Sequence, residues 1–320
     1  MTLPARPARL LTAGLCLAAL VLAGCSLGAS PRGGGAELTV TRGFGADTIT
    51  RAREDPIRGG ETVMRLLLRN AKVSTRYGGR FVEGVNGINS RAEGARREDW
   101  FYYVNGIEAE VGAAERDVEP GDRVWWDYHD WTGAMRVPAV VGSYPEPFLH
   151  GSEGKLFPVR IDCAQDAGTA CADVADRLNR AGVGASTTAI GAATGKQVMR
   201  LVVGVWGDVR RDSAARQVEE GPDKSGVFAR FAAAAAGGIA YELDLLDAQD
   251  RVVRRLGRGA GLVAATRFEE QQPTWVVTGT DRSGLDRAVA LLDEKLLRDR
   301  FAIATDGSGA VRLPLADQGS

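Results

Sequence analysis

The fold of the first half is decided by two aromatic stretches, WFYYVNG at residues 100–106 and RVWWDYHDW at residues 123–131. Aromatic and β-branched residues are enriched in strands, so both stretches are predicted strands. Asn105-Gly106 closes the first stretch, and these residue types tolerate the positive φ of a type I′ turn. The two stretches therefore predict neighbouring strands of an antiparallel sheet.

Helix and hairpin signals lie before these strands. Residues 37–41 alternate as a strand, and residues 61–70 (ETVMRLLLRN) carry apolar side chains at helical spacing. Residues 72–76 and 80–85 flank a Gly-Gly pair, which indicates a hairpin. A strand, a crossing helix and several further strands predict an α+β domain of β-grasp type over residues 37–142.

Five short motifs follow one another in this half: Glu61-Thr62-Val63, Tyr77-Gly78-Gly79, Val85-Asn86-Gly87-Ile88, WFYYVNG, and Pro120-Gly121-Asp122 leading to Trp125-Trp126. In order and spacing, residues 37–135 resemble the transcobalamin-like C-terminal domain family of bacterial surface proteins. That family is similar to the small β-domain of transcobalamin and intrinsic factor. The resemblance implies a β-grasp fold, a corrinoid as the first ligand to test, and delivery to a membrane importer.

The N-terminus has the features of an export signal. Two arginines precede an apolar run at residues 10–23, which is too short to span a bilayer comfortably. The run ends in Leu-Ala-Gly before Cys25 and looks like a bacterial lipobox. We expect a signal peptide at 1–24 and a lipidated Cys25 followed by a flexible tether to residue 36. These features predict a lipid anchor at the outer face of the cell membrane; the alternative is an ordinary signal peptide with a chance cysteine.

Charge and composition exclude one class of function. The chain has 40 basic and 41 acidic side chains, giving a formal net charge of −1. A nucleic-acid-binding protein needs a basic surface, so no nucleic-acid partner is expected.

The second half begins after a predicted linker at residues 143–155, which contains two prolines and two glycines. Residues 156–305 alternate predicted strands and helices, which favours a separate α/β domain with a mixed sheet. Residues 306–320 are expected to form a C-terminal tail. This half resembles no family that we recognise, and its role stays open.

The cysteines and histidines limit the chemistry. Cys163 and Cys171 form an even pair in an oxidising compartment, which favours a disulfide over two buried thiols. The chain has only His129 and His150, at no ligand spacing from the cysteines, so no metal site is expected. No serine elbow or Cys–His pairing is found, so no catalytic residue and no cofactor is assigned. A hydrolase in the second half is a weaker alternative.

Strand periodicity along residues 123–131 predicts the binding site. Alternation places Trp125, His129 and Trp131 on the face opposite Val124, and one helix covers only one side of a small sheet. Asp127 shares the face of His129, and Asp130 lies on the other; these polar side chains are expected at an exposed edge.

We therefore expect an exposed aromatic platform, with Trp125, His129 and Trp131 binding a flat ligand by stacking and Tyr103 and Asn105 fixing its orientation. The alternative is that the aromatic face is a domain interface. The competing function is that of a non-enzymatic envelope interaction protein, which docks a partner protein or a polymer through its aromatic face.

Overall fold

The computed structural model describes most of the chain. Contacts between Cα atoms divide it into Met1–Pro31 and a compact unit, Arg32–Ser320. The predicted lipid site at Cys25 lies outside the described residues. Within the described ranges no helix is long and apolar enough to cross a membrane. The described ranges are 1–2, 34–94, 96–193, 195–234, 240–268 and 271–316.

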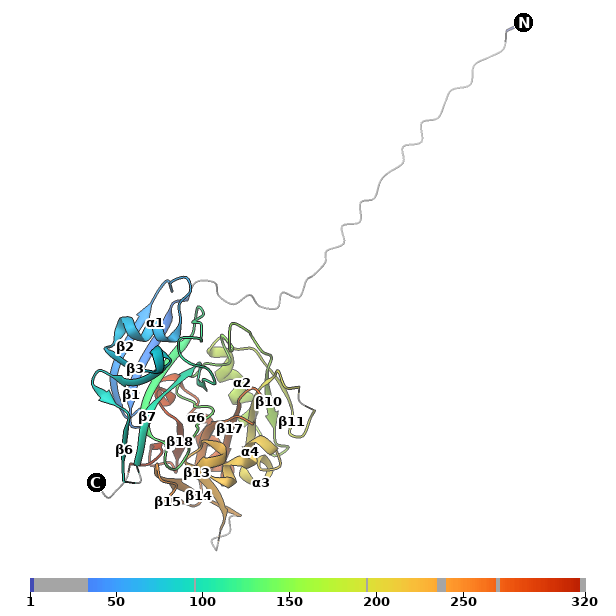
Figure 1. The fold of residues 1–320 in the computed structure, drawn as a ribbon. Helices are drawn as coiled ribbons and strands as arrows, with labels where there is room; N and C mark the ends of the chain where they lie inside the picture. The colour runs from blue at the N-terminus through green and yellow to red at the C-terminus, as the bar shows by residue number, and fades with distance from the viewer. Residues whose placement is uncertain (3–33, 95, 194, 235–239, 269–270, 317–320) are drawn as a thin grey trace. The chain divides into compact units, whose positions relative to one another are not determined.

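The first half contains a mixed sheet with strand order β2-β1-β9-β7-β6 (Figure 1). β1 forms an antiparallel hairpin with β2 and pairs in parallel with β9, and β7 pairs antiparallel with β9. The predicted β-grasp topology has this order, and the α+β prediction is confirmed. The elements are β1 (Ala36–Arg42), β2 (Asp47–Glu54), α1 (Val63–Asn70), β6 (Arg91–Glu93), β7 (Arg96–Val104), β8 (Ile107–Glu108) and β9 (Arg123–Asp130), with a small sheet of β3 (Val73–Arg76), β4 (Phe81–Val85) and β5 (Ile88–Asn89).

Helix α1 covers one face of this sheet. It begins after Thr62, whose hydroxyl accepts a hydrogen bond from the Arg65 backbone N–H at 3.3 Å. Leu66 and Leu67 on its inner face are fully buried in the core beneath the helix. Burying each such side chain stabilises the fold by roughly 1.5–3 kcal/mol. Leucines at helical spacing thus fix the helix to the sheet.

The second half is built on a seven-stranded mixed sheet in the order β11-β10-β12-β17-β16-β18-β19. Its first four strands are parallel, and the last three join antiparallel. A smaller sheet, β13-β14-β15, accompanies it. The strands are β10 (Val159–Cys163), β11 (Ala185–Ala189), β12 (Met199–Val205), β13 (Ala229–Ala233), β14 (Tyr241–Leu246), β15 (Val252–Leu256), β16 (Gly261–Thr266), β17 (Thr274–Gly279), β18 (Ala302–Thr305) and β19 (Ala310–Leu313). The α-helices are α2 (Ala170–Arg180), α3 (Trp206–Val209), α4 (Ser213–Arg216), α5 (Pro222–Ser225), α6 (Arg282–Ala290) and α7 (Glu294–Leu297).

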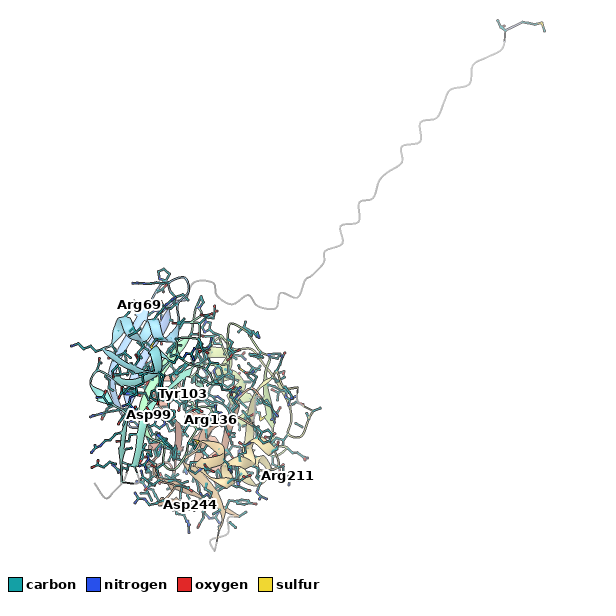
Figure 2. All side chains as sticks on the ribbon, viewed as in Figure 1. Arg69, Asp99, Tyr103, Arg136, Arg211 and Asp244 are labelled. Carbon is teal, nitrogen blue, oxygen red and sulfur yellow. A yellow bond between two sulfur atoms is a disulfide. The ribbon has the colours of Figure 1, made fainter. Side chains whose placement is uncertain are left out.

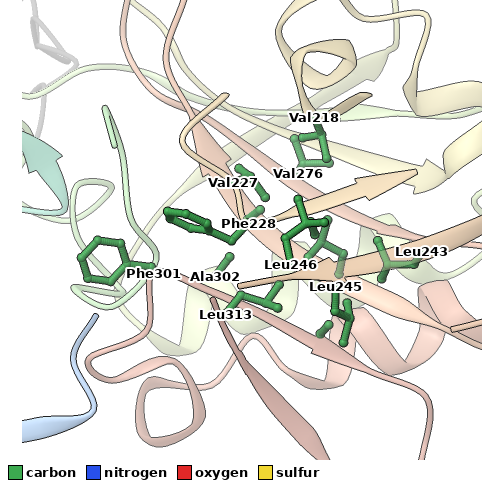
Figure 3. Packing of buried hydrophobic residues seen from close by; sticks show 14 of the residues in the cluster. Val218, Val227, Phe228, Leu243, Leu245, Leu246, Val276, Phe301, Ala302 and Leu313 are labelled. Carbon is green, nitrogen blue, oxygen red and sulfur yellow. The ribbon is translucent and has the colours of Figure 1, made fainter. Parts of the chain in front are cut away.

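The segment between the halves contributes to the core. Tyr144 and Phe148 are 4% and 5% exposed, and both rings pack against Trp275 at 5.9 and 5.0 Å. A second hydrophobic cluster draws side chains from both halves, including Trp125 of β9 and Phe228 and Phe301 of the second half. Figure 3 shows Phe228 and Phe301 in this cluster. The two halves therefore share buried apolar surface.

Candidate functional site

Both faces of strand β9 are buried. Trp126 and Tyr128 lie in the core beneath α1, as the alternation predicts. Trp125 and His129, on the opposite face, are only 3% and 2% exposed. Their expected exposure is therefore wrong, although their shared face was predicted correctly. The reason is that side chains of the second half cover the face that α1 leaves open.

Phe301 is at the centre of this covered face. Its ring lies edge-on to Trp125 at 5.2 Å and to His129 at 5.3 Å. It is also edge-on to Phe44 at 5.0 Å and to Tyr103 at 5.6 Å. Edge-to-face geometry is favourable for aromatic rings and adds to the gain from burial. The predicted aromatic platform is thus the interior of an aromatic cluster.

The other predicted ligand contacts also lie inside the fold. Tyr103 is fully buried (labelled in Figure 2), and its hydroxyl has no hydrogen-bond partner among the described residues. Burial raises the pKa of Tyr103 well above its usual value. Asn105 is also fully buried, and its amide donates to Asp122 Oδ1 at 2.8 Å and to the Gly151 carbonyl at 3.0 Å. It fixes the turn after β7. Trp131 is partly exposed.

Asp127 organises the buried end of strand β9. Its carboxyl oxygens accept hydrogen bonds from the Phe44 backbone N–H at 2.9 Å and the Gly45 backbone N–H at 2.8 Å. They also accept from the Thr41 hydroxyl and contact His129 Nδ1 at 2.9 Å. The carboxyl group therefore joins the β1–β2 turn to β9 and orients the imidazole ring.

His129 is held between two aromatic rings. Phe44 and Phe101 stack on it with centroid distances of 4.5 Å each. The expectation that Asp127, His129 and Asp130 are exposed edge residues is wrong, because all three are buried and β9 is a central strand. The hydrogen bond and the two stacked rings leave the imidazole little freedom to rotate.

The largest of the described cavities opens beside His129. It has a volume of about 650 Å³, and its wall combines Phe44 and His129 with residues of the second half. We call it the His129 cavity and define it by Ala46, His129, Asp130, Gln249, Arg312 and Leu315, all of which line it.

Polar contacts across the cavity wall tie the halves together. The Gln249 amide, on the turn between β14 and β15, donates to Asp130 Oδ2 at 2.7 Å. Thr132 donates to the other oxygen of Asp130 through its hydroxyl and, at 3.0 Å, through its backbone N–H. Burial raises the pKa of Asp130, but these hydrogen bonds outweigh that effect and hold the pKa below its usual value. Asp130 is thus an ionised and already partnered group in the cavity wall.

The two cysteines of the second half and His150 do not line the His129 cavity. A disulfide joins Cys163 at the end of β10 to Cys171 in α2, as the disulfide prediction requires. His150 Nδ1 contacts Glu146 Oε1 at 2.5 Å, and the Glu146 carboxylate raises the pKa of His150 despite partial burial. Among the described residues no group of three or more His, Cys, Asp or Glu side chains could hold a metal ion.

One family model matches the first half of the chain. It describes a domain of unknown function, DUF4430, and covers residues 60–130, from α1 to β9. Its description does not mention transcobalamin, so the resemblance to transcobalamin-like domains stays a prediction. No curated protein matches this chain.

One solved structure is similar to part of the chain. It comes from Ruminococcus gnavus ATCC 29149 and is described as a "putative metal binding protein". The identity is 14% and the TM-score 0.24, with 30% of this chain and 97% of that chain covered. A similarity at this level carries no argument about what this protein binds.

Proposed function

We propose that this protein is a non-enzymatic binding protein that is anchored by a lipid at the outer face of the cell membrane. It holds a small ligand in the His129 cavity. The observation that carries the proposal is the cavity itself, at about 650 Å³ beside an imidazole fixed by Asp127. Binding sites for small molecules commonly measure about 300–1,000 Å³ and combine apolar walls with a few fixed polar groups. Both histidine rings contact carboxyl groups, at Asp127 and Glu146, which fix the orientation of the imidazole rings.

Stacking of a corrinoid on Trp125 and His129 does not fit the burial of these two side chains. A corrinoid bound to this protein would have to reach the His129 cavity instead. Docking of a partner protein through the same aromatic face is excluded for the same reason. Cobalamin is therefore one of many compounds to be tested. Delivery of cobalamin to a membrane importer is proposed only if cobalamin binds.

The test is a thermal-shift screen on the soluble fragment 32–320, the compact unit of the structure. A ligand that binds only the folded state raises the apparent stability by mass action. The substitution Ala46→Trp places a large ring at an exposed position that lines the cavity. Ala114→Trp adds the same ring at an exposed position outside this cavity and is the matched control.

Compounds that raise the melting temperature of the wild type should lose their effect on Ala46→Trp and keep it on Ala114→Trp. If no compound acts on the wild type, or if both variants respond alike, the cavity is not the binding site.

The anchor is tested separately on the full chain. Mass spectrometry of the N-terminal peptide should find an acyl group on Cys25. The Cys25→Ala variant should be lost from the membrane fraction, or its signal peptide should stay uncleaved. An unmodified Cys25 in the mature wild type would remove the proposed location.

A further inference from the structure

The hairpin of β3 and β4 ends in an exposed aromatic turn, residues 77–81, which we call the aromatic tip. Tyr77 is 80% exposed and Phe81 is 38% exposed, and neither ring belongs to a hydrophobic cluster of the described residues. Tyr77 has a φ of 51°, in the left-handed region, where a bulky side chain is strained. An exposed and strained aromatic residue adds little to the stability of the fold, which indicates a role outside the fold.

The aromatic tip lies at the end of the first sheet where the folded unit begins. An ideal Cβ on Gly112 would lie 3.6 Å from the Arg80 carbonyl oxygen, so the tip contacts the loop between β8 and β9. Val111 in the same loop is exposed and adds apolar surface. The loop continues to Gly121, whose backbone N–H donates to the Gly35 carbonyl at 3.1 Å. One loop therefore holds the aromatic tip and the entry of the chain at the same end of the sheet.

The His129 cavity opens at the other end of this sheet. Strands β1 and β9 are parallel, and Glu37 lies opposite Arg123 where both strands begin. His129 is close to the end of β9, and Ala46 lies in the turn that follows β1. Strands of seven or eight residues are about 25 Å long, so the length of the sheet separates the cavity from the aromatic tip.

The proposed lipid anchor brings the aromatic tip close to the membrane. Cys25 lies ten residues before Gly35, and ten residues of fully extended chain span at most about 36 Å. The acyl group would therefore keep this end of the sheet near the lipid. A tether rich in glycine and serine does not fix how the folded unit is turned, so a second contact is needed to orient it.

We propose that the aromatic tip rests on the lipid surface and places the rings of Tyr77 and Phe81 among the lipid headgroups. The proposal rests on the proposed lipid anchor at Cys25. Tyrosine is enriched at membrane–water interfaces because its ring is apolar and its hydroxyl stays hydrated. The contact would turn the His129 cavity away from the membrane, toward the medium from which a ligand is captured.

Charge at this end of the sheet is mixed. Arg76, at the base of the aromatic tip, forms an ion pair with Glu83. Arg80 is close to a loop that also carries Glu115 and Asp117. The two rings, rather than a net charge, therefore carry the contact, which should depend little on salt or on the charge of the lipid.

The experiment holds the fragment 32–320 on phosphatidylcholine vesicles by an N-terminal histidine tag and a nickel-chelating lipid, so it does not depend on acylation of Cys25. The variants Tyr77→Cys and Val252→Cys each have one free thiol, because the two native cysteines of the fragment form a disulfide. An environment-sensitive fluorophore on this thiol reports contact with lipid. Val252 is the matched control, because it is an exposed apolar residue three positions after Gln249, which lines the cavity.

The fluorophore at position 77 should shift its emission to shorter wavelength on the vesicles and should be quenched by doxyl-labelled lipid. The fluorophore at position 252 should show neither change. No quenching at position 77, or equal quenching at both positions, would overturn the proposal.

A second variant tests whether both rings take part. Phe81→Ser, added to the labelled Tyr77→Cys fragment, should lower the quenching, because one of the two apolar groups in the lipid is lost. Val252→Ser in the same background should leave the quenching unchanged. Quenching that Phe81→Ser does not alter, or that appears only with phosphatidylglycerol and disappears in salt, would show that the rings do not carry the contact.

These failures differ from a failure of the proposed function. A tip that stays free of lipid on the tethered fragment would leave the anchor and the cavity in place. An unmodified Cys25 in the mature chain would remove the anchor whatever the fluorophore shows.

Discussion

Replacing Phe301 by alanine tests whether the aromatic cluster holds the two halves together. Phe301 is 2% exposed and lies edge-on to four other aromatic rings. Removal of a buried phenylalanine side chain costs about 3–5 kcal/mol, and each edge-to-face contact contributes roughly 0.5–1.5 kcal/mol beyond burial. We therefore expect a loss of about 4 kcal/mol.

The assay is urea unfolding of the fragment 32–320, followed by tryptophan fluorescence. At an m-value of roughly 2–3 kcal/mol per molar urea, the loss corresponds to a midpoint lower by about 1.5 M. The matched control is Phe268→Ala, because Phe268 is 42% exposed. A surface substitution of this kind changes stability by about 0.5 kcal/mol or less. If Phe301→Ala lowers the midpoint no more than Phe268→Ala, the cluster does not join the halves and the reasoning is refuted.

Two further predictions concern pairs of side chains. Because Glu146 raises the pKa of His150, the stabilisation from their contact is complete below about pH 6.5 and is lost as the pH rises through the raised pKa of the folded state. The stability difference between the wild type and His150→Gln should therefore shrink with rising pH, and a constant difference would contradict the contact. The disulfide between Cys163 and Cys171 closes a loop with a sequence separation of 8, so its reduction should cost about 2.5 kcal/mol of unfolding free energy. Alkylation of either thiol in native, unreduced protein would show that the bond is absent.

The first half could be predicted from sequence because its strands alternate strongly. The periodicity of β9 gave the correct faces for Trp125 and Trp126. It could not show what covers the Trp125 face, because the covering ring of Phe301 lies far away in sequence. Strand β2 gives a weak signal for a related reason: along residues 47–54 both faces are exposed or half-exposed, so no apolar alternation marks it.

The candidate site was only partly visible in the sequence. Asp127 and His129 two residues apart on one strand predicted side chains on the same face, and the structure adds their contact. The residues that line the cavity come from segments far apart in the chain, so no local pattern points to it. Strand β19 (Ala310–Leu313) lies within the expected tail. The sequence did not reveal it because the strand is short and is flanked by glycine and proline.

The aromatic cluster also sets the order in which the protein can fold. Phe44 lies near the start of the folded unit and Phe301 near its end, yet their rings are in contact. Contacts between residues so distant in sequence form late, because a long loop must close before they are made. Trp125 and His129 therefore stay uncovered until the last strands of the chain are available. A chain exported N-terminus first would cross the membrane without this core and complete it only on the far side.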